Sequence, residues 1–62
     1  MNKSIKSITM TDEQTEMYDD DGSEAASLLA ELRAEAQQII DNGDAFTVEI
    51  YTADGIVADV VQ

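Results

Sequence analysis

The clearest hydrophobic pattern in this chain runs from Ser23 to Gly43. Apolar side chains recur there every three or four residues, at Ala25, Leu28, Leu29, Leu32, Ala36, Ile39 and Ile40. At about 100° per residue these positions fall within one sector roughly 120° wide, which is typical of a helix that buries a single stripe. The pattern therefore predicts an amphipathic helix over residues 23–42.

Both ends of this stretch carry residues that favour helix termini. Ser23, or Asp21 with Glu24 three residues on, offers a side-chain oxygen to the first free amides. Glu24 also suits the positive end of the helix dipole. At the other end, Asn42 and Gly43 supply a residue that can turn left-handed and close a C-cap.

The segment before the helix is rich in β-branched residues. Residues 4–11 contain the run IKSITM, in which Ile8 and Met10 share one face and Ile5 lies on the other. Lysine side chains on such a strand discourage edge-to-edge aggregation. We therefore predict an edge strand over residues 4–11.

Residues 12–22 are strongly acidic and leave two structures open. Thr11 followed by Gln14 fits a capping box, which favours a short helical turn within an acidic loop. Residues 15–18 can instead pair back on the first strand as a hairpin. In either case we expect Met17 and Tyr18 to hold this segment to the core.

Residues 45–62 predict a β-hairpin, with its turn at Asp54-Gly55. A two-residue turn would place Asp59 opposite Ile50 and bury an unpaired carboxylate, which costs several kcal/mol. A three-residue turn with Gly55 in a bulge avoids this burial. We therefore predict the bulged turn.

This register sorts the hairpin residues into two faces. The predicted inner face comprises Phe46, Val48, Ile50, Ile56, Ala58 and Val60, and the outer face comprises Thr47, Glu49, Tyr51, Val57, Asp59 and Val61. On the outer face Glu49 and Asp59 become cross-strand neighbours of like charge, which is mildly destabilising. The apolar patch of Tyr51, Val57 and Val61 is expected to pair with a second copy, as a homodimer, or with a target.

Together these elements predict the α+β class. The expected fold is a small β-α-β-β domain, with one amphipathic helix packed on a three-stranded antiparallel sheet. The position of the first strand relative to the hairpin stays open. We expect residues 1–62 to form a single domain near the lower size limit for a hydrophobic core, with no Cys to supplement it.

The composition excludes most catalytic chemistry. Without His or Cys, the Ser-His and Cys-His nucleophile systems and ordinary zinc sites are absent. If Gly22 filled the glycine position of an EF-hand loop, the first and twelfth ligands would be Met17 and Leu28, and neither carries a carboxylate. We expect no enzyme activity, no cofactor and no metal.

The hydropathy and the net charge of the chain bear on its location and its partners. No apolar run reaches membrane-spanning length, and the N-terminus lacks the apolar core of a signal peptide, so a cytoplasmic protein without a membrane partner is expected. Fourteen Asp and Glu against three Lys and Arg give a formal net charge of −11. This balance argues against direct binding to nucleic acid or anionic lipid and favours a basic partner.

The acidic side chains suggest where such a partner binds. Glu24, Glu31 and Glu35 fall within about 40° of one another on one flank of the predicted helix, although like charges at i, i+4 are unfavourable. Arg33 lies on the opposite flank. The predicted partner-binding residues are Asp19, Asp20, Asp21, Glu24, Glu31, Glu35, Glu49 and Asp59.

In size and acidity the chain resembles the small DNA mimics encoded by phages and plasmids, including anti-restriction and anti-CRISPR proteins. The resemblance implies an inhibitor whose carboxylates replace phosphates and block the basic groove of a host defence protein that binds nucleic acid. Two other interpretations stay open. One is a small interaction or dimerisation module whose acidity serves solubility; the other is a domain adapted to a high-salt cytoplasm.

Overall fold

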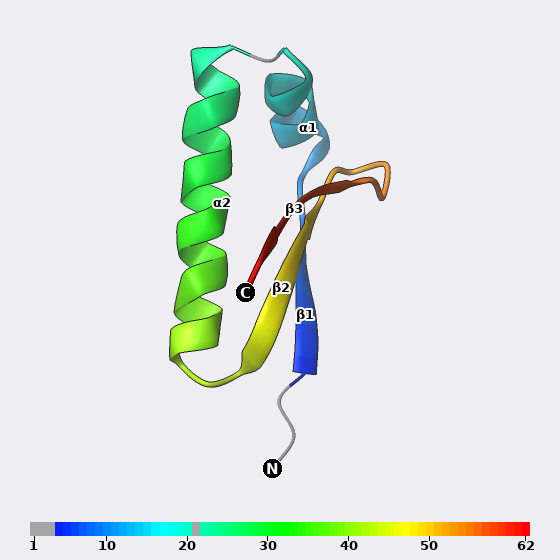
Figure 1. Cartoon of the computed structure of the whole chain (residues 1–62). Coiled ribbons are helices and arrows are strands. Elements are labelled where there is room, and N and C mark those ends of the chain that lie inside the picture. The colour runs from blue at the N-terminus through cyan, green and yellow to red at the C-terminus, as the bar shows by residue number, and fades with distance from the viewer. Residues whose placement is uncertain (1–3, 21) are drawn as a thin grey trace.

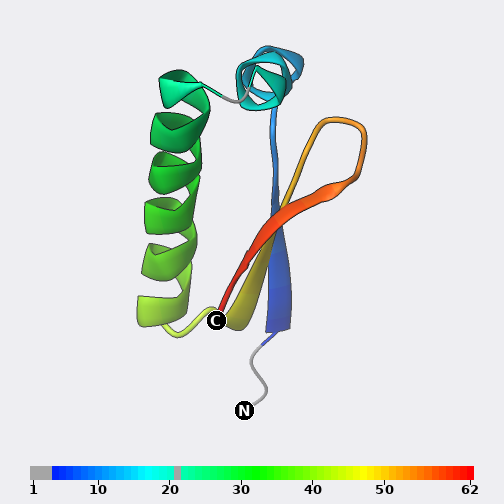
Figure 2. The same ribbon diagram turned by 45° about the horizontal axis from the view of Figure 1, so that its top comes forward.

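The computed structural model describes residues 4–20 and 22–62. Along the chain the elements are β1 (Ser4–Thr9), α1 (Asp12–Asp19), α2 (Ser23–Asp41), β2 (Ala45–Tyr51) and β3 (Val57–Val61). Helix α2 lies along one face of the sheet, and α1 lies at the end of the sheet where β1 ends (Figures 1 and 2). The result is a small α+β fold with two helices rather than the single predicted one.

The sheet is mixed, so the predicted antiparallel sheet is wrong. Its order is β1-β2-β3, with β1 parallel to β2 and β2 antiparallel to β3. The 19 residues of α2 extend about 28 Å at 1.5 Å per residue, which is enough to return the chain along the whole sheet. Strand β2 therefore starts beside the start of β1 and runs in the same direction (Figure 1).

The acidic segment after β1 forms helix α1, which decides between the two structures left open by the sequence. The capping box is present: the Thr11 hydroxyl accepts from the Gln14 N–H at 3.1 Å, and the Gln14 side chain accepts from the Thr11 N–H at 2.9 Å. Met17 and Tyr18 are half-buried against the core, as predicted. Within the described residues, neither helix combines the length and apolar character that a membrane crossing requires.

The predicted stripe of α2 packs against the sheet. Ala25, Leu28, Leu32 and Ala36 are buried, and Leu29, Ile39 and Ile40 are half-buried. The stripe meets Val48 and Ile50 of β2, the two largest fully buried side chains of the described residues. Ile8 and Met10 join this core from the β1 side, as their shared face predicts.

The two ends of α2 differ from each other. The N-cap is Gly22, which forms no side-chain cap bond, so the predicted cap at Ser23 is wrong. The C-cap prediction is confirmed. Gly43 has a φ of +84° and donates to the Ile40 carbonyl at 3.0 Å, while the Asp44 N–H donates to the Ile39 carbonyl at 3.1 Å.

The hairpin turn is the predicted three-residue turn. Thr52 donates to the Ile56 carbonyl at 2.8 Å, and Gly55 donates to the Thr52 carbonyl at 2.9 Å. Gly55 adopts a φ of +88°, which a glycine reaches without the steric cost of a Cβ. The turn is tied to α1, because the Ala53 N–H donates to the Thr15 hydroxyl at 2.8 Å.

Beyond the turn, a second irregularity overturns the predicted register. Tyr51 pairs with Val57, but Ile50 pairs with Asp59. Ala58 is therefore an extra residue on β3. From Asp59 onward, each side chain faces the side of the sheet opposite to the one predicted. Val61 is therefore buried with the core at 6% exposure, and Val60 faces outward at 41% exposure.

Two other residues of the predicted inner face are also exposed. Phe46 is 52% exposed because the β1–β2 pairing moves from Ser4↔Ala45 to Ile5↔Thr47, which leaves Phe46 as an extra residue on β2. Ala45, fully buried, takes the inward position instead. Ile56 is 65% exposed at the turn.

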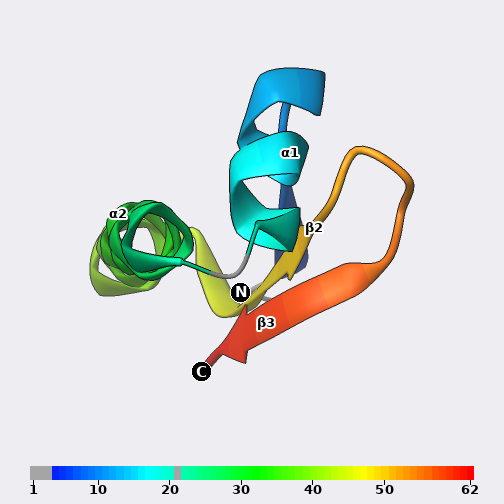
Figure 3. The same cartoon turned by 90° about the horizontal axis from the view of Figure 1, so that it is seen from above.

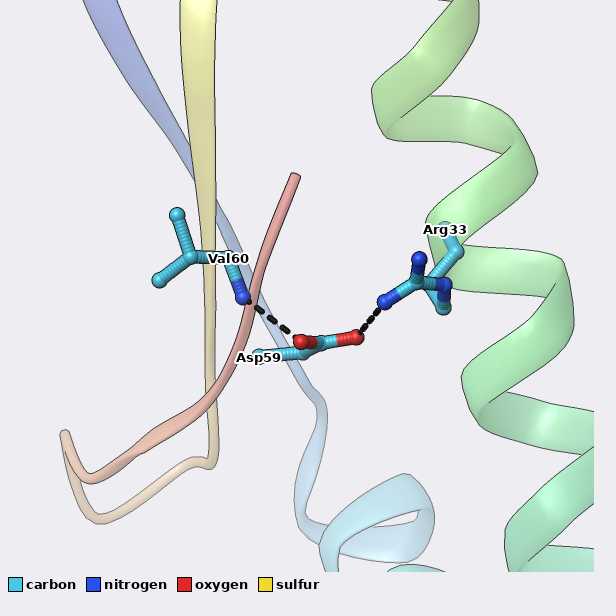
Figure 4. A network of polar contacts seen from close by, with 3 residues as sticks. All are labelled: Arg33, Asp59 and Val60. Atoms are coloured by element: carbon cyan, nitrogen blue, oxygen red, sulfur yellow. Dashed lines mark hydrogen bonds and ion pairs between the residues drawn. The ribbon is translucent and has the colours of Figure 1, made fainter. Parts of the chain in front are cut away.

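The register has a physical reason that the sequence argument missed. The side chain of Asp59 faces α2, where it forms an ion pair with Arg33 (Figure 4). Its other carboxylate oxygen accepts the Val60 N–H at 2.8 Å. The carboxylate is paired and 24% exposed, so the cost predicted for an unpaired buried charge does not arise.

Replacement of Gly55 tests the left-handed turn. Because a Cβ at this position meets no atom within 4 Å, the strain of Gly55→Ala comes from its positive φ alone. We expect a loss of about 1 kcal/mol in the free energy of unfolding, measured by urea denaturation. Gly22→Ser is the control. Gly22 is equally open but has a φ of −110°, and the hydroxyl adds a missing N-cap, so no loss is expected. Equal stability of Gly55→Ala and the wild type would contradict the turn.

A double-mutant cycle tests the Arg33–Asp59 ion pair. Arg33→Ala, Asp59→Ala and the double variant should give a coupling energy of about 0.5–1 kcal/mol, because the guanidinium is half exposed and its charge is screened. Urea unfolding at low and high salt measures the coupling, which should shrink as salt rises. A coupling energy of zero at low salt would mean that this ion pair does not stabilise the register.

Candidate protein-binding surface

One flank of α2 carries three exposed carboxylates in a row. Glu24, Glu31 and Glu35 are all exposed. At 1.5 Å per residue, Glu24 and Glu31 are separated by about 10.5 Å along the helix axis, and Glu31 and Glu35 by about 6 Å. The structure therefore brings these predicted site residues together as one acidic row, which we call the glutamate row.

The described basic side chains do not neutralise this row. Arg33 projects from the other flank of α2 and pairs with Asp59. Lys6 lies on β1, opposite Val48. Within residues 4–20 and 22–62, the Arg33–Asp59 contact is the only ion pair. The glutamate row consequently presents uncompensated negative charge.

The end of α1 adds further negative charge beside the start of α2. Asp19 is the last residue of α1 and Asp20 is its C-cap, and both are exposed. Acidic groups are unfavourable there because the helix dipole places partial negative charge at this terminus, and the last turn contains no basic residue. Asp21, the remaining residue predicted in this group, lies outside the described residues.

A small hollow lies between the two helices beside the glutamate row. Its volume is about 170 Å³, and its lining consists of Met17, Ser23, Glu24, Ser27, Leu28 and Glu31. Met17 and Leu28 provide apolar surface, while Glu24 and Glu31 provide carboxylates. This combination suits a lysine or arginine side chain, whose methylene stem prefers apolar contact and whose charged end prefers a carboxylate.

The sequence analysis did not predict this hollow, although it placed Glu24 and Glu31 on one flank of the helix. Ser27 and Leu28 stand three and four residues after Glu24, and Glu31 stands seven after it, so their shared face was readable from helical spacing. The contribution of Met17 was not, because it depends on how α1 packs against α2. A second hollow, of about 550 Å³, lies on the other side of this helix pair beside Tyr18 and Leu29.

The two acidic residues of the hairpin do not form the predicted pair. Asp59 faces α2 and is neutralised by Arg33, so it does not belong to an open acidic surface. Glu49 lies opposite Val60 on the other face of the sheet. There it accepts the Tyr51 hydroxyl at 2.6 Å. This hydrogen bond, with smaller contributions from burial and from the negative charge of Glu49, raises the pKa of Tyr51 above its ordinary value.

The predicted assembly patch is changed by the same register. Tyr51 and Val57 lie on the face away from α2, as expected, with Val57 49% exposed. Val61 is part of the core, so its assignment to this patch is wrong. Val60 takes its place on the outer face.

The described residues contain no group of three His, Cys, Asp or Glu side chains placed to hold a metal ion. No family model, curated protein or solved structure matches the chain. The assignment of a function therefore depends on the geometry and charge of the surfaces described above.

Proposed function

We propose that this chain is an acidic inhibitor that blocks the basic groove of a protein that binds nucleic acid. Its carboxylates would replace phosphates, as in the phage and plasmid DNA mimics that it resembles. The observation that carries the proposal is the glutamate row: Glu24, Glu31 and Glu35 are exposed, aligned and without a described basic partner.

The spacing of the glutamate row supports the comparison with a nucleic-acid strand. Successive phosphates on one strand of B-DNA advance about 3.4 Å along the axis. The glutamate row is about 16.5 Å long along the axis of α2 and so covers the axial length of about five such steps. A groove that follows one strand over this length can meet all three carboxylates.

The position of the charge also supports binding rather than stability. Asp19 and Asp20 lie at the negative end of the α1 dipole, and Glu31 and Glu35 repel each other at i, i+4. Each arrangement costs the isolated fold a few tenths of a kcal/mol. A basic partner removes these costs on binding, and long-range attraction raises its association rate.

The hollow beside Met17 would add specificity to this attraction. A basic side chain of the target can insert its stem against Met17 and Leu28 while its charged end reaches Glu24 and Glu31. Such a contact would favour a basic side chain of a folded groove over small cations in solution. The inhibitor would act in the cytoplasm, where a host defence protein meets foreign DNA.

Neutralisation of the glutamate row tests the proposal. The probe is the fraction of a bacterial extract retained on DNA-cellulose, and the measurement is its release by added protein. Glu31→Gln/Glu35→Gln should release these proteins at least tenfold less effectively, because two contacts of about 1 kcal/mol each are lost. Glutamine preserves helix propensity, so circular dichroism should be unchanged.

A matched control separates charge placement from total charge. Asp44→Asn/Asp54→Asn removes the same charge from two exposed positions outside the helices. This variant should release proteins as well as the wild type does. Equal loss in both variants would mean that net charge alone acts, and no release by the wild type would overturn the proposal.

The salt dependence of folding separates mimicry from high-salt adaptation. A phosphate mimic must fold in dilute buffer, whereas a salt-adapted domain gains order as salt screens its self-repulsion. We expect full helicity by circular dichroism at low salt and no cooperative gain on addition of potassium chloride. A folding transition that requires molar salt would favour the high-salt interpretation.

A further inference from the structure

The sheet has a second surface that the proposed function does not use. We define the outer face as Ile5, Glu49, Tyr51, Val57 and Val60, which lie away from α2 in the observed register. Figure 3 shows α2 on one side of the sheet, with no described element covering the other. Ile5, Val57 and Val60 are 59%, 49% and 41% exposed.

Two features indicate that the outer face is a contact surface. Parallel strands are usually covered on both faces, but no described helix covers the outer face of the parallel pair β1–β2. The open side carries three apolar side chains from β1 and β3, on either side of the central strand. Exposed apolar side chains on one face of a small domain favour association with a partner.

A carboxylate stands in the middle of this apolar surface. Glu49 lies on the central strand, with Ser7 beside it on β1 and Val60 beside it on β3. The Tyr51 hydroxyl donates to one of its oxygens at 2.6 Å. Any partner that covers the outer face must therefore supply a group that stabilises this carboxylate when water leaves.

Among the described residues, a second copy of this chain offers no such group on the matching surface. Of the described cations, Lys6 lies opposite Val48, on the α2 side of the sheet, and Arg33 lies on α2 in its pair with Asp59. A face-to-face dimer would also bring two Glu49 carboxylates together and two chains of net charge −11 into contact. The charge pattern favours a different, basic protein.

We propose that the outer face binds a protein segment that places an arginine against Glu49, between apolar side chains that cover Ile5, Val57 and Val60. Arginine fits because its planar fork bonds a carboxylate through two N–H groups and stacks on an aromatic ring such as that of Tyr51. This inference does not depend on the proposed function, since the outer face and the glutamate row share no residue.

The probe is the peptide acetyl-Val-Ser-Arg-Ser-Val-amide, titrated into the ¹⁵N-labelled protein. In an extended chain its arginine and both valines point to the same side, because side chains two residues apart share a face. Amide shifts are expected on β1, around Glu49 and on β3. The same peptide with citrulline in place of arginine keeps the shape but lacks the charge, and it should bind at least threefold more weakly. Equal binding of the two peptides, or shifts confined to α2, would overturn the proposal.

Two single variants test whether the arginine peptide binds at the Glu49 carboxylate. Glu49→Gln should weaken binding of the arginine peptide at least threefold, whereas Glu31→Gln should leave shifts on the outer face unchanged. If Glu31→Gln weakens these shifts as much as Glu49→Gln does, the attraction is general and the proposal fails.

Tyr51 supplies a spectroscopic readout in a Tyr18→Phe background. A guanidinium at Glu49 competes for the hydrogen bond that raises the pKa of Tyr51, so saturation with the arginine peptide should lower that pKa. An unchanged titration at saturation contradicts the placement of arginine.

Sedimentation should show a monomer at all micromolar concentrations; a dimer that Val60→Ser disrupts would make a second copy the occupant and overturn the proposal.

Discussion

The packing of α2 on β2 is the contact on which the rest of the fold depends. Val48 and Ile50 are fully buried beneath the apolar stripe of the helix, and each such side chain contributes about 1.5–3 kcal/mol when it leaves water. A chain of 62 residues without Cys has few other sources of stability. The two outer strands are held through this centre, β1 by pairing with β2 and β3 by pairing on its other edge.

Sequence reasoning located the elements better than it located their partners. The α2 stripe, its glycine terminus and the three-residue turn follow from local spacing and backbone preference, and the structure confirms each of them. The direction of β1 and the register of β3 depend on contacts distant in sequence. Arg33 lies 26 residues from Asp59 in the sequence. Their ion pair neutralises the Asp59 carboxylate, so the register with Asp59 opposite Ile50, rejected in the sequence analysis because it buries an unpaired charge, is the one that forms. The same limit applies to the site: the glutamate row was readable from helical spacing, but the contribution of Met17 and the separation of Glu49 from Asp59 were not.

The negative charge of the molecule is spread unevenly over its surface. One flank of α2 carries the glutamate row, the other flank carries Arg33 in its ion pair, and the outer face sets a single carboxylate among apolar side chains. In the proposed function, attraction over long distances would come from the glutamate row, since its three charges are exposed. Selectivity at contact would come from the outer face if it binds the proposed segment, because one charge must then be matched among apolar side chains.

The parallel pairing of β1 with β2 has a consequence for the order of folding. Ser4 pairs with Ala45, so both helices must form or collapse before these residues meet, whereas β2 and β3 are joined by a short turn. Closure of long loops is slow because its entropic cost precedes any gain from contact. We therefore expect the hairpin and α2 to assemble first and β1 to dock last along the free edge of β2. Because Ile5 belongs to β1, the outer face is complete only when β1 has paired with β2, so any partner of that face would bind only the fully folded chain.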